Sequence, residues 1–404
     1  MSTPADDFPT VRPVESYPRR TPPAPPAGGG SVWRVLFALL LIASLGLNIL
    51  VCGGGMLAGL SGATDGPAHV IEKYSSGTAS AANKVAIVKI EGAIMEGMLG
   101  YAHKQIEQAA GDDSVKAVVV RIESPGGTIT ASDELHRRLC QLRDGTTPKL
   151  QSTGVRPKPL VVSMGAIAAS GGYYIAMPAV DSANVVRAEA PKIYAERTTI
   201  TGSIGVYASL PNAAKFVNDH GFKMELIKAG GIKGSGSPFH EMTPQERQPW
   251  QDMVAHAYKQ FIGIVEEGRP ALKGKLETDL FPPKPVPLYD DKGNILLGED
   301  KTPKTAMYTR KLADGGIFTA DEAKQYGLVD MIGTVDDAAA EAAKQASLGS
   351  FKVVVYDKPA TLMSALTGNV KAPDWSKAAA ALGPRVWAIV PQAQLGVAVE
   401  LLGQ

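Results

Sequence analysis

The sequence predicts an α/β fold preceded by one N-terminal transmembrane helix, and three observations support this prediction. From about residue 84, apolar runs typical of strands alternate with glycine-rich loops and helical segments. An uncharged apolar stretch covers residues 35–60. Hydrophobic residues make up 45% of the 404-residue chain while the formal net charge is +1, so core material is ample and nothing in the charge favours nucleic acid as a partner.

The N-terminal segments predict a membrane anchor. Residues 1–32 are polar and rich in proline, so we expect a disordered cytoplasmic leader. Residues 33–60 contain the roughly 20 apolar residues that span a bilayer. By the positive-inside rule, the preceding arginines keep the N-terminus in the cytoplasm and export the rest of the chain; they are Arg12, Arg19, Arg20 and Arg34. We therefore expect a single-pass protein of the inner membrane whose folded part is periplasmic.

Two other interpretations of this region are weaker. A cleaved signal peptide conflicts with the long polar leader and the lack of a clear Ala-x-Ala cleavage site. A lipid-modified Cys52 conflicts with the bulky Val51 before it. The chain has only one further cysteine, Cys140, and its six histidines show no metal-ligand spacing. We expect no disulfide framework, no metal and no cofactor.

The predicted globular part follows a Ser/Gly/Ala-rich linker at residues 61–83. Strands are expected at 85–90, 115–122 and 160–164, and the Val-rich second run is typical of a parallel strand that is buried on both faces. A helix is expected at about 130–143. Two glycine-rich loops follow the second and third strands, and the carboxyl ends of such strands are where α/β proteins form their sites.

Ser170 is the most informative residue of the second glycine-rich loop. It lies between two alanines and two glycines, directly after the third strand. We expect this strand to end at Gly165 and a small-residue helix to present Ser170 at a sharp turn, with the Gly171 amide free to donate a hydrogen bond. A serine nucleophile beside an oxyanion donor needs this geometry. The alternative is a glycine-rich packing turn without chemistry.

Motifs along residues 84–345 resemble the signal peptide peptidase A family in matching order. They are Arg-Ile-Glu-Ser-Pro-Gly-Gly at 121–127, Ala-Ala-Ser-Gly-Gly-Tyr-Tyr at 168–174, Thr-Gly-Ser-Ile-Gly-Val at 201–206 and Ile-Lys-Ala-Gly-Gly-Ile-Lys at 227–233. That family consists of membrane-anchored serine proteases whose fold resembles the ClpP/crotonase superfamily. The resemblance implies a protease domain of repeated β-β-α units over residues 84–350.

The resemblance also implies a Ser/Lys dyad. Ser170 matches the nucleophile, and the family spacing selects Lys233 rather than Lys228 as the general base. Lys228 follows an expected strand end and is expected to be solvated. A lysine acts as a base only in its neutral form, which burial or a neighbouring cation favours. Ser203 resembles the hydroxyl that orients the lysine.

For the oxyanion hole, the resemblance implies backbone amides from two loops. Gly171 matches one donor, and the pair Gly126 and Gly127 resembles the oxyanion strand, with no means of choosing between them. A conventional Ser/His/Asp triad with His220 or His240 as its base is a weaker alternative, because neither histidine lies in a recognisable motif.

The resulting prediction is a membrane-bound serine endopeptidase that degrades remnant signal peptides after protein export. The family forms rings, which implies a cyclic homo-oligomer in which serine and lysine can come from neighbouring subunits. The alternatives are an inactive membrane scaffold of protease fold and an acyl-CoA hydratase-like crotonase member.

Three further regions carry expectations. Thr243-Pro244-Gln245-Glu246 is a capping box that begins an amphipathic helix, whose apolar stripe is expected to be core or subunit interface; the stripe comprises Trp250, Met253, Val254, Ala257, Phe261 and Val265. Residues 275–314 form an insertion of unknown role. Residues 351–404 are expected to form a strand and a tail with a possible oligomer contact near Trp387.

Overall fold

The computed structural model describes residues 70–147, 156–179, 192–290, 293–357 and 385–389. The expected leader and anchor at 1–32 and 33–60 lie outside these ranges. Among the described helices, none combines the length and the apolar character that a membrane span requires. The chain divides into two compact units, residues 1–67 and 68–404, and every described helix and strand belongs to the second.

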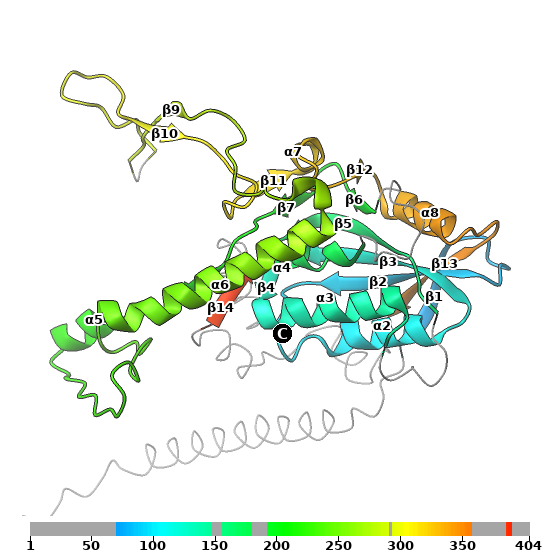
Figure 1. The fold of residues 1–404 in the computed structure, drawn as a ribbon, viewed down its shortest axis with the longest axis horizontal. Coiled ribbons are helices and arrows are strands. Elements are labelled where there is room, and N and C mark those ends of the chain that lie inside the picture. Colours follow the sequence, from blue (N-terminus) through cyan, green and yellow to red (C-terminus); the bar gives the residue numbers. More distant parts are fainter. Residues whose placement is uncertain (1–69, 148–155, 180–191, 291–292, 358–384, 390–404) are drawn as a thin grey trace, which may run out of the picture. The chain divides into compact units, whose positions relative to one another are not determined.

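A largely parallel sheet forms the centre of this unit (Figure 1). Its strand order is β1-β13-β2-β3-β5-β6-β12, and β1 is antiparallel to β13 while the other neighbours on this path run parallel. The strands are β1 (Ile71–Gly77), β2 (Lys84–Glu91), β3 (Val115–Ser124), β5 (Leu160–Ala169), β6 (Ile193–Ala195), β12 (Met331–Ile332) and β13 (Lys352–Asp357). The sequence-based prediction of an α/β fold is confirmed.

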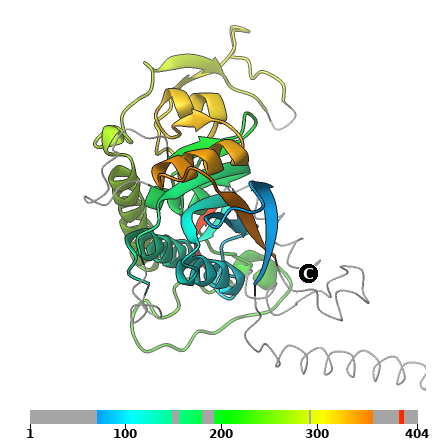
Figure 2. The same ribbon diagram turned by 90° about the vertical axis from the view of Figure 1, so that its right-hand side faces the viewer.

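Helices cover both faces of the sheet, as Figure 2 shows. Alternate side chains of β2 explain this, since Ala86 and Val88 belong to one buried cluster and Val85 and Ile87 to another. The first cluster packs against α2 (Gly100–Gly111), α3 (Ile129–Asp144) and α6 (Pro244–Gly268). The second packs against α8 (Val335–Gln345) through its alanines. The Val-rich strands are therefore buried on both faces, as their sequence predicts.

Local capping signals fix the helix ends. Thr128 caps α3 by accepting a hydrogen bond from the Ala131 amide, and Gly145 ends it with a left-handed φ of 68°. Thr243 and Glu246 form the predicted capping box of α6. The helices expected at about 130–143 and after residue 243 are thus confirmed.

Two boundaries differ from the prediction. Residues 71–77, in the expected linker, form the edge strand β1, which is held by backbone pairing with β13 and carries few apolar residues that could signal it. Strand β5 continues past Gly165 to Ala169 because its end pairs with β7 (Ile200–Gly202). At Gly165, a Cβ would lie 1.6 Å from the Glu123 carboxylate, so this glycine makes room for a neighbouring side chain rather than ending the strand.

The remaining elements are short. Strand β7 also pairs with β11 (Ile317–Thr319), and a separate three-stranded sheet contains β4 (Gly126–Thr128), β14 (Arg385–Ile389) and β8 (Tyr207–Ser209). The short helices are α4 (Gly171–Tyr174), α5 (Ala214–Asp219) and α7 (Ala320–Gln325), with 3-10 turns at Met177–Ala179 and Pro270–Leu272. In the insertion, β9 (Lys284–Pro287) and β10 (Thr305–Tyr308) form a hairpin that projects from the body (Figure 1).

Candidate active site

Ser170 lies at the turn between β5 and α4. Its backbone has φ 55° and ψ −116°, a conformation that costs a non-glycine residue about 1–3 kcal/mol. The Ser170 amide donates to the Gly202 carbonyl at 2.8 Å, which holds the turn against β7. The side chain is buried, and its Oγ has no hydrogen-bond partner among the described residues. The turn is therefore strained, fixed in place and equipped with an uncommitted hydroxyl.

Gly171 and Gly172 begin helix α4 directly after Ser170. The first amides of a helix have no intrahelical acceptor, so these N–H groups are available beside the serine. At Gly172, a Cβ would lie 2.7 Å from the Ser124 carbonyl oxygen, which shows how closely the turn packs against the end of β3. The predicted donor, Gly171, therefore lies where an oxyanion formed at Ser170 could be bound.

The structure distinguishes between the two glycines of the other loop. The Gly126 amide donates to Ser124 Oγ at 3.1 Å, and Gly126 has a φ of 101° that favours glycine. The Ile94 amide donates to the Gly126 carbonyl, and the Ile94 carbonyl accepts a hydrogen bond from the Thr128 amide. These two hydrogen bonds lie on either side of Gly127 along the strand. In such a parallel bridge the N–H and C=O of Gly127 point to the opposite edge, toward β14. Because the Gly126 amide is already bonded to Ser124, Gly127 is the remaining candidate for the second oxyanion donor.

Ser203 is adjacent to the same site. It follows Gly202, whose carbonyl accepts from the Ser170 amide, and it also has a left-handed φ of 52°. Its Oγ donates to the Gly315 carbonyl at 3.1 Å, and its amide donates to the Gly316 carbonyl. Pairing of β5 with β7 thus brings Ser170 and Ser203 together, although 33 positions separate them in the sequence.

Lys233 lies in a different part of the unit. It is exposed, in a loop that packs on the first turns of α6. Two positions further on, Ser235 Oγ donates to the Glu246 carbonyl at 2.7 Å, and Trp250 Nε1 donates to Ser235 Oγ at 2.7 Å. These contacts attach the loop to the N-terminal end of α6.

The competing lysine, Lys228, was expected to be solvated at the end of a strand, but in the structure its side chain forms an ion pair. Residues 222–228 form no strand, and Lys228 Nζ lies 2.6 Å from a carboxylate oxygen of Glu246, whose side chain is 2% exposed. The other Glu246 oxygen lies 3.2 Å from His240 Nε2. Hydrogen bonds, first from Lys228 and then from the Thr243 amide, lower the pKa of Glu246 to about 2. Lys228 therefore forms an ion pair that fixes the loop.

Glu246 anchors the lysine loop to α6, a role that the sequence did not reveal. The capping-box pattern identified only its contact with Thr243, and nothing in the local sequence indicates a partner 18 positions earlier. The ion pair depends on how the loop folds back onto the first turn of α6, which the local sequence does not indicate.

A single chain does not bring Ser170 and Lys233 together. The ring of Tyr174, four residues after Ser170, lies 5.2 Å from the ring of Phe261 on α6. Glu246, beside the lysine loop, precedes Phe261 by 15 helical residues, or about 22 Å at 1.5 Å per residue. Figure 1 shows α6 running from α4 to the end where α5 lies. The serine and the lysine thus lie near opposite ends of α6.

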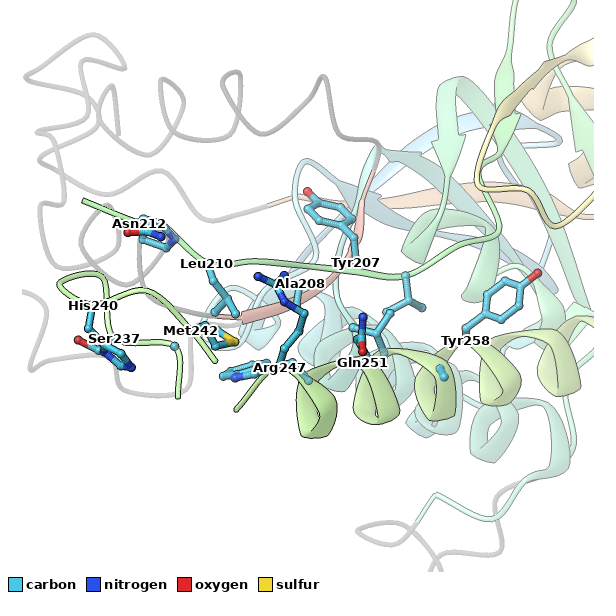
Figure 3. Close-up of a pocket in the computed structure, with 16 residues that line it drawn as sticks. Tyr207, Ala208, Leu210, Asn212, Ser237, His240, Met242, Arg247, Gln251 and Tyr258 are labelled. Atoms are coloured by element: carbon cyan, nitrogen blue, oxygen red, sulfur yellow. The ribbon is translucent and has the colours of Figure 1, made fainter. Parts of the chain in front are cut away.

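A pocket of about 630 Å³ occupies the space between these two ends (Figure 3). Its walls are the segment 206–212, which follows Ser203, and the outer part of α6. Figure 3 shows Tyr258 at one end and His240 at the other. Trp250 and Val254 line the pocket, whereas Ala257, Phe261 and Val265 are buried. The apolar stripe of α6 is therefore core at one end and pocket wall at the other.

The alternative histidine bases are not beside Ser170 either. His240 contacts Glu246 at the far end of α6, and the ring Nδ1 of His220 lies 2.8 Å from the Phe216 carbonyl oxygen at the end of α5. Within the described ranges, no group of three or more His, Cys, Asp or Glu residues could hold a metal ion.

Comparisons with known proteins agree with this arrangement of motifs. The profile of peptidase family S49 matches residues 155–278 and 301–349, which leaves out much of the insertion. A protein of Synechocystis named as a protease is 31% identical over 292 residues, 72% of this chain and 85% of that protein. The chain belongs to peptidase family S49.

Other relatives differ more in length. Protease 4 of Salmonella typhi is 29% identical over 71% of this chain, but the chain spans only 39% of that protein. A protein of Enterococcus faecium named as a signal peptide peptidase is 28% identical over 70% of this chain and 66% of its own length. Among solved structures, a ClpP1 mutant from Listeria monocytogenes matches with 12% identity and a TM-score of 0.33, covering 63% of this chain and 94% of that one.

Proposed function

We propose that this protein is a serine endopeptidase with Ser170 as its nucleophile and Lys233 as its general base. The observation that carries the proposal is the strained, buried Ser170 turn, which the Gly171 amide follows directly. Membership of peptidase family S49 gives the reaction class. Remnant signal peptides are the proposed substrates, because a relative named as a signal peptide peptidase aligns over 70% of this chain.

The chemistry follows from these groups. Ser170 Oγ attacks the scissile carbonyl carbon while its proton passes to the neutral amine of Lys233. The amides of Gly171 and Gly127 bind the oxyanion, and collapse of this intermediate breaks the C–N bond as the lysine returns the proton to the leaving amine. Water, deprotonated by the same lysine, then hydrolyses the acyl-enzyme. Ser203, one residue from the strand that holds Ser170, orients the lysine.

Because the lysine lies about 22 Å along α6 from the serine's neighbourhood, a neighbouring subunit is proposed to supply it. Repetition of one such contact closes a ring, in which each lysine loop reaches the serine of the next copy. The exposed lysine loop and the pocket beside Trp250 are where the subunits would meet. The fold of the protease unit is proposed to be that of the ClpP/crotonase superfamily.

The proposed location is the inner membrane, with the folded unit on the periplasmic side. Support comes from the apolar residues 33–60 and the arginines before them. Digestion of membrane vesicles with an added protease tests the orientation. Inverted vesicles expose only the cytoplasmic side, and permeabilised vesicles also expose the periplasmic side. The leader should be digested from the cytoplasmic side, while the folded unit is digested only after access from the periplasmic side. Digestion of both from one side contradicts the proposal.

The deciding experiment is covalent labelling with a fluorophosphonate probe on the folded protein. Labelling at Ser170, identified by mass spectrometry and lost in Ser170→Ala, is expected for the peptidase. Absence of label in folded, assembled protein would favour the inactive scaffold instead.

A further inference from the structure

Helix α4, which follows the candidate nucleophile, is a single turn that cannot hold its own position. The Tyr174 amide donates to the Ser170 carbonyl at 2.9 Å, and the next amide, that of Ile175, donates to the Gly171 carbonyl at 3.1 Å. An isolated turn of this length is unstable, because so few hydrogen bonds do not offset the entropy lost when its dihedral angles are fixed. The strained backbone of Ser170 adds to this instability. Contacts outside α4 must therefore fix the direction of the Gly171 amide.

Tyr173, inside α4, makes a contact of this kind. Its side chain is 0% exposed, and its hydroxyl donates to the Leu328 carbonyl at 2.9 Å. Burial raises the pKa of the Tyr173 hydroxyl well above its usual range, so the group remains a neutral hydrogen-bond donor. The bond joins α4 to the segment 326–330, which connects α7 to β12.

The segment 326–330 is itself fixed to two larger elements. Arg269, directly after α6, donates from Nε and Nη2 to the Gly327 carbonyl at 2.8 and 2.6 Å. Its Nη1 lies 2.8 Å from one carboxylate oxygen of Asp330, and the other oxygen accepts from two successive amides at the beginning of β6. The Arg269 side chain is only 10% exposed, so these charge-assisted bonds are largely shielded from water. Tyr173 therefore bonds to a support that α6 and β6 hold in place.

We propose that Tyr173 is a positioning residue for the reaction at Ser170, because its hydroxyl fixes α4 and with it the Gly171 amide. This inference rests on the proposed function. Groups that bind an oxyanion contribute fully to the rate only when they are held within about 0.5 Å of the productive geometry. Without the hydroxyl, α4 loses its buried bond to the segment 326–330, and the strained turn relaxes. The loss affects the transition state more than the bound substrate, so kcat should fall while KM changes little.

Tyr174 provides a comparison within the same turn. Its hydroxyl donates to Asp133 Oδ1 on α3 at 2.7 Å, but this contact is only partly buried, so water can replace the hydroxyl. Its ring also packs on the ring of Phe261, a contact that a phenylalanine would keep. Tyr174→Phe should therefore lower kcat less than Tyr173→Phe does.

The test uses Tyr173→Phe in the full-length protein, because this change removes one oxygen atom and keeps the ring. Both kcat for a peptide substrate and the rate of fluorophosphonate labelling at Ser170 should be at least about tenfold lower than in the wild type, with KM within about twofold. Tyr356→Phe is the matched control, since Tyr356 is also 0% exposed and its hydroxyl has no hydrogen-bond partner among the described residues. The control should behave as the wild type does. Wild-type kcat and labelling in Tyr173→Phe would overturn the inference.

A second variant tests the route through the segment 326–330. Arg269→Lys replaces the planar fork that binds the Gly327 carbonyl and Asp330 together, so kcat should fall roughly severalfold. The double variant Tyr173→Phe/Arg269→Lys should be no slower than the slower single variant, because both changes act on one contact. Wild-type kcat in Arg269→Lys, or decreases that multiply in the double variant, would overturn the inference.

Hydrogen exchange separates this inference from the proposed function. The amides of Tyr174 and Ile175 close α4, and they should exchange at least about tenfold faster in Tyr173→Phe than in the wild type or in Tyr356→Phe. This result would support the role of Tyr173 even if the wild type neither hydrolyses peptides nor labels at Ser170, in which case only the peptidase proposal fails. Equal exchange in the wild type and in Tyr173→Phe would overturn the positioning role.

Discussion

The serine turn and the lysine loop of this protein are built in opposite ways. Ser170 is buried, backbone-strained and bound to β7 within the central sheet. Lys233 is exposed, on a loop attached to the far end of α6 by an ion pair and two side-chain hydrogen bonds. The comparison shows that half of the proposed dyad is formed within the chain, while the other half is displayed on a surface. Under the proposed mechanism, a site divided in this way would make assembly a condition of activity.

Removing the nucleophile should have the largest effect. Ser170→Ala should reduce peptide hydrolysis by at least about 10⁴-fold, because no other group can form the acyl-enzyme. The fold should persist, since the Ser170 amide that holds the turn is unchanged. Activity assays with circular dichroism on the purified variant check both points. Turnover close to that of the wild type would refute Ser170 as the nucleophile.

Removing the base should be nearly as severe, and mixing tests where the lysine comes from. Lys233→Ala alone should be almost inactive. If serine and lysine belong to adjacent subunits, a 1:1 exchange mixture of Ser170→Ala and Lys233→Ala subunits should recover about a quarter of wild-type activity, since half of the serines meet half of the lysines. A mixture that stays inactive, despite subunit exchange shown with two labels, would mean that each chain completes its own dyad.

Ser203→Ala should have a smaller effect. Loss of one orienting hydrogen bond of about 0.5–1.5 kcal/mol corresponds to a decrease in kcat of at most about tenfold. KM should change little, because Ser203 is buried and is proposed to contact the lysine rather than the substrate. Steady-state kinetics provide the measurement. A change confined to KM would contradict an orienting role.

Loss of the Lys228–Glu246 ion pair should have the smallest effect on activity, and it should act through the position of the lysine loop. Glu246→Gln should lower both peptide hydrolysis and fluorophosphonate labelling of Ser170 roughly severalfold, because a looser loop places the general base less well. Glu241→Gln, an exposed neighbour, is the matched control. Hydrolysis and labelling equal to those of the wild type would show that the ion pair does not position the lysine for catalysis.

The same pair predicts a pH dependence of stability. Because folding lowers the pKa of Glu246 from 4.5 to about 2, its contribution to stability is complete above about pH 4.5 and is lost as the pH falls toward 2. Thermal unfolding of the wild type should therefore depend more steeply on pH between 4.5 and 2 than that of Glu246→Gln. Parallel curves for the two proteins would exclude this linkage.

The sequence by itself determined the parts that depend on local patterns. The Val-rich strand at 115–122, the helix that begins after Thr128 and the capping box at Thr243 follow from neighbouring residues, and the structure has all three. The turn at Ser170 could also be predicted, since small residues on both sides of a serine after a buried strand leave few other conformations. Only the end of that strand was misplaced, because the contact of Gly165 with Glu123 is not local.

Tertiary structure alone decided how these parts meet. Pairing of β5 with β7 placed Ser203 beside Ser170, and the parallel bridge at Ile94 turned the N–H and C=O of Gly127 toward β14. The pairing of β14 with β4 and β8 and the ion pair between Lys228 and Glu246 have no sequence signature. All of these contacts share one physical reason. Backbone pairing and charge contacts between distant segments depend on which surfaces the folded chain brings together, and the hydrophobic periodicity of one segment does not identify the segment that pairs with it.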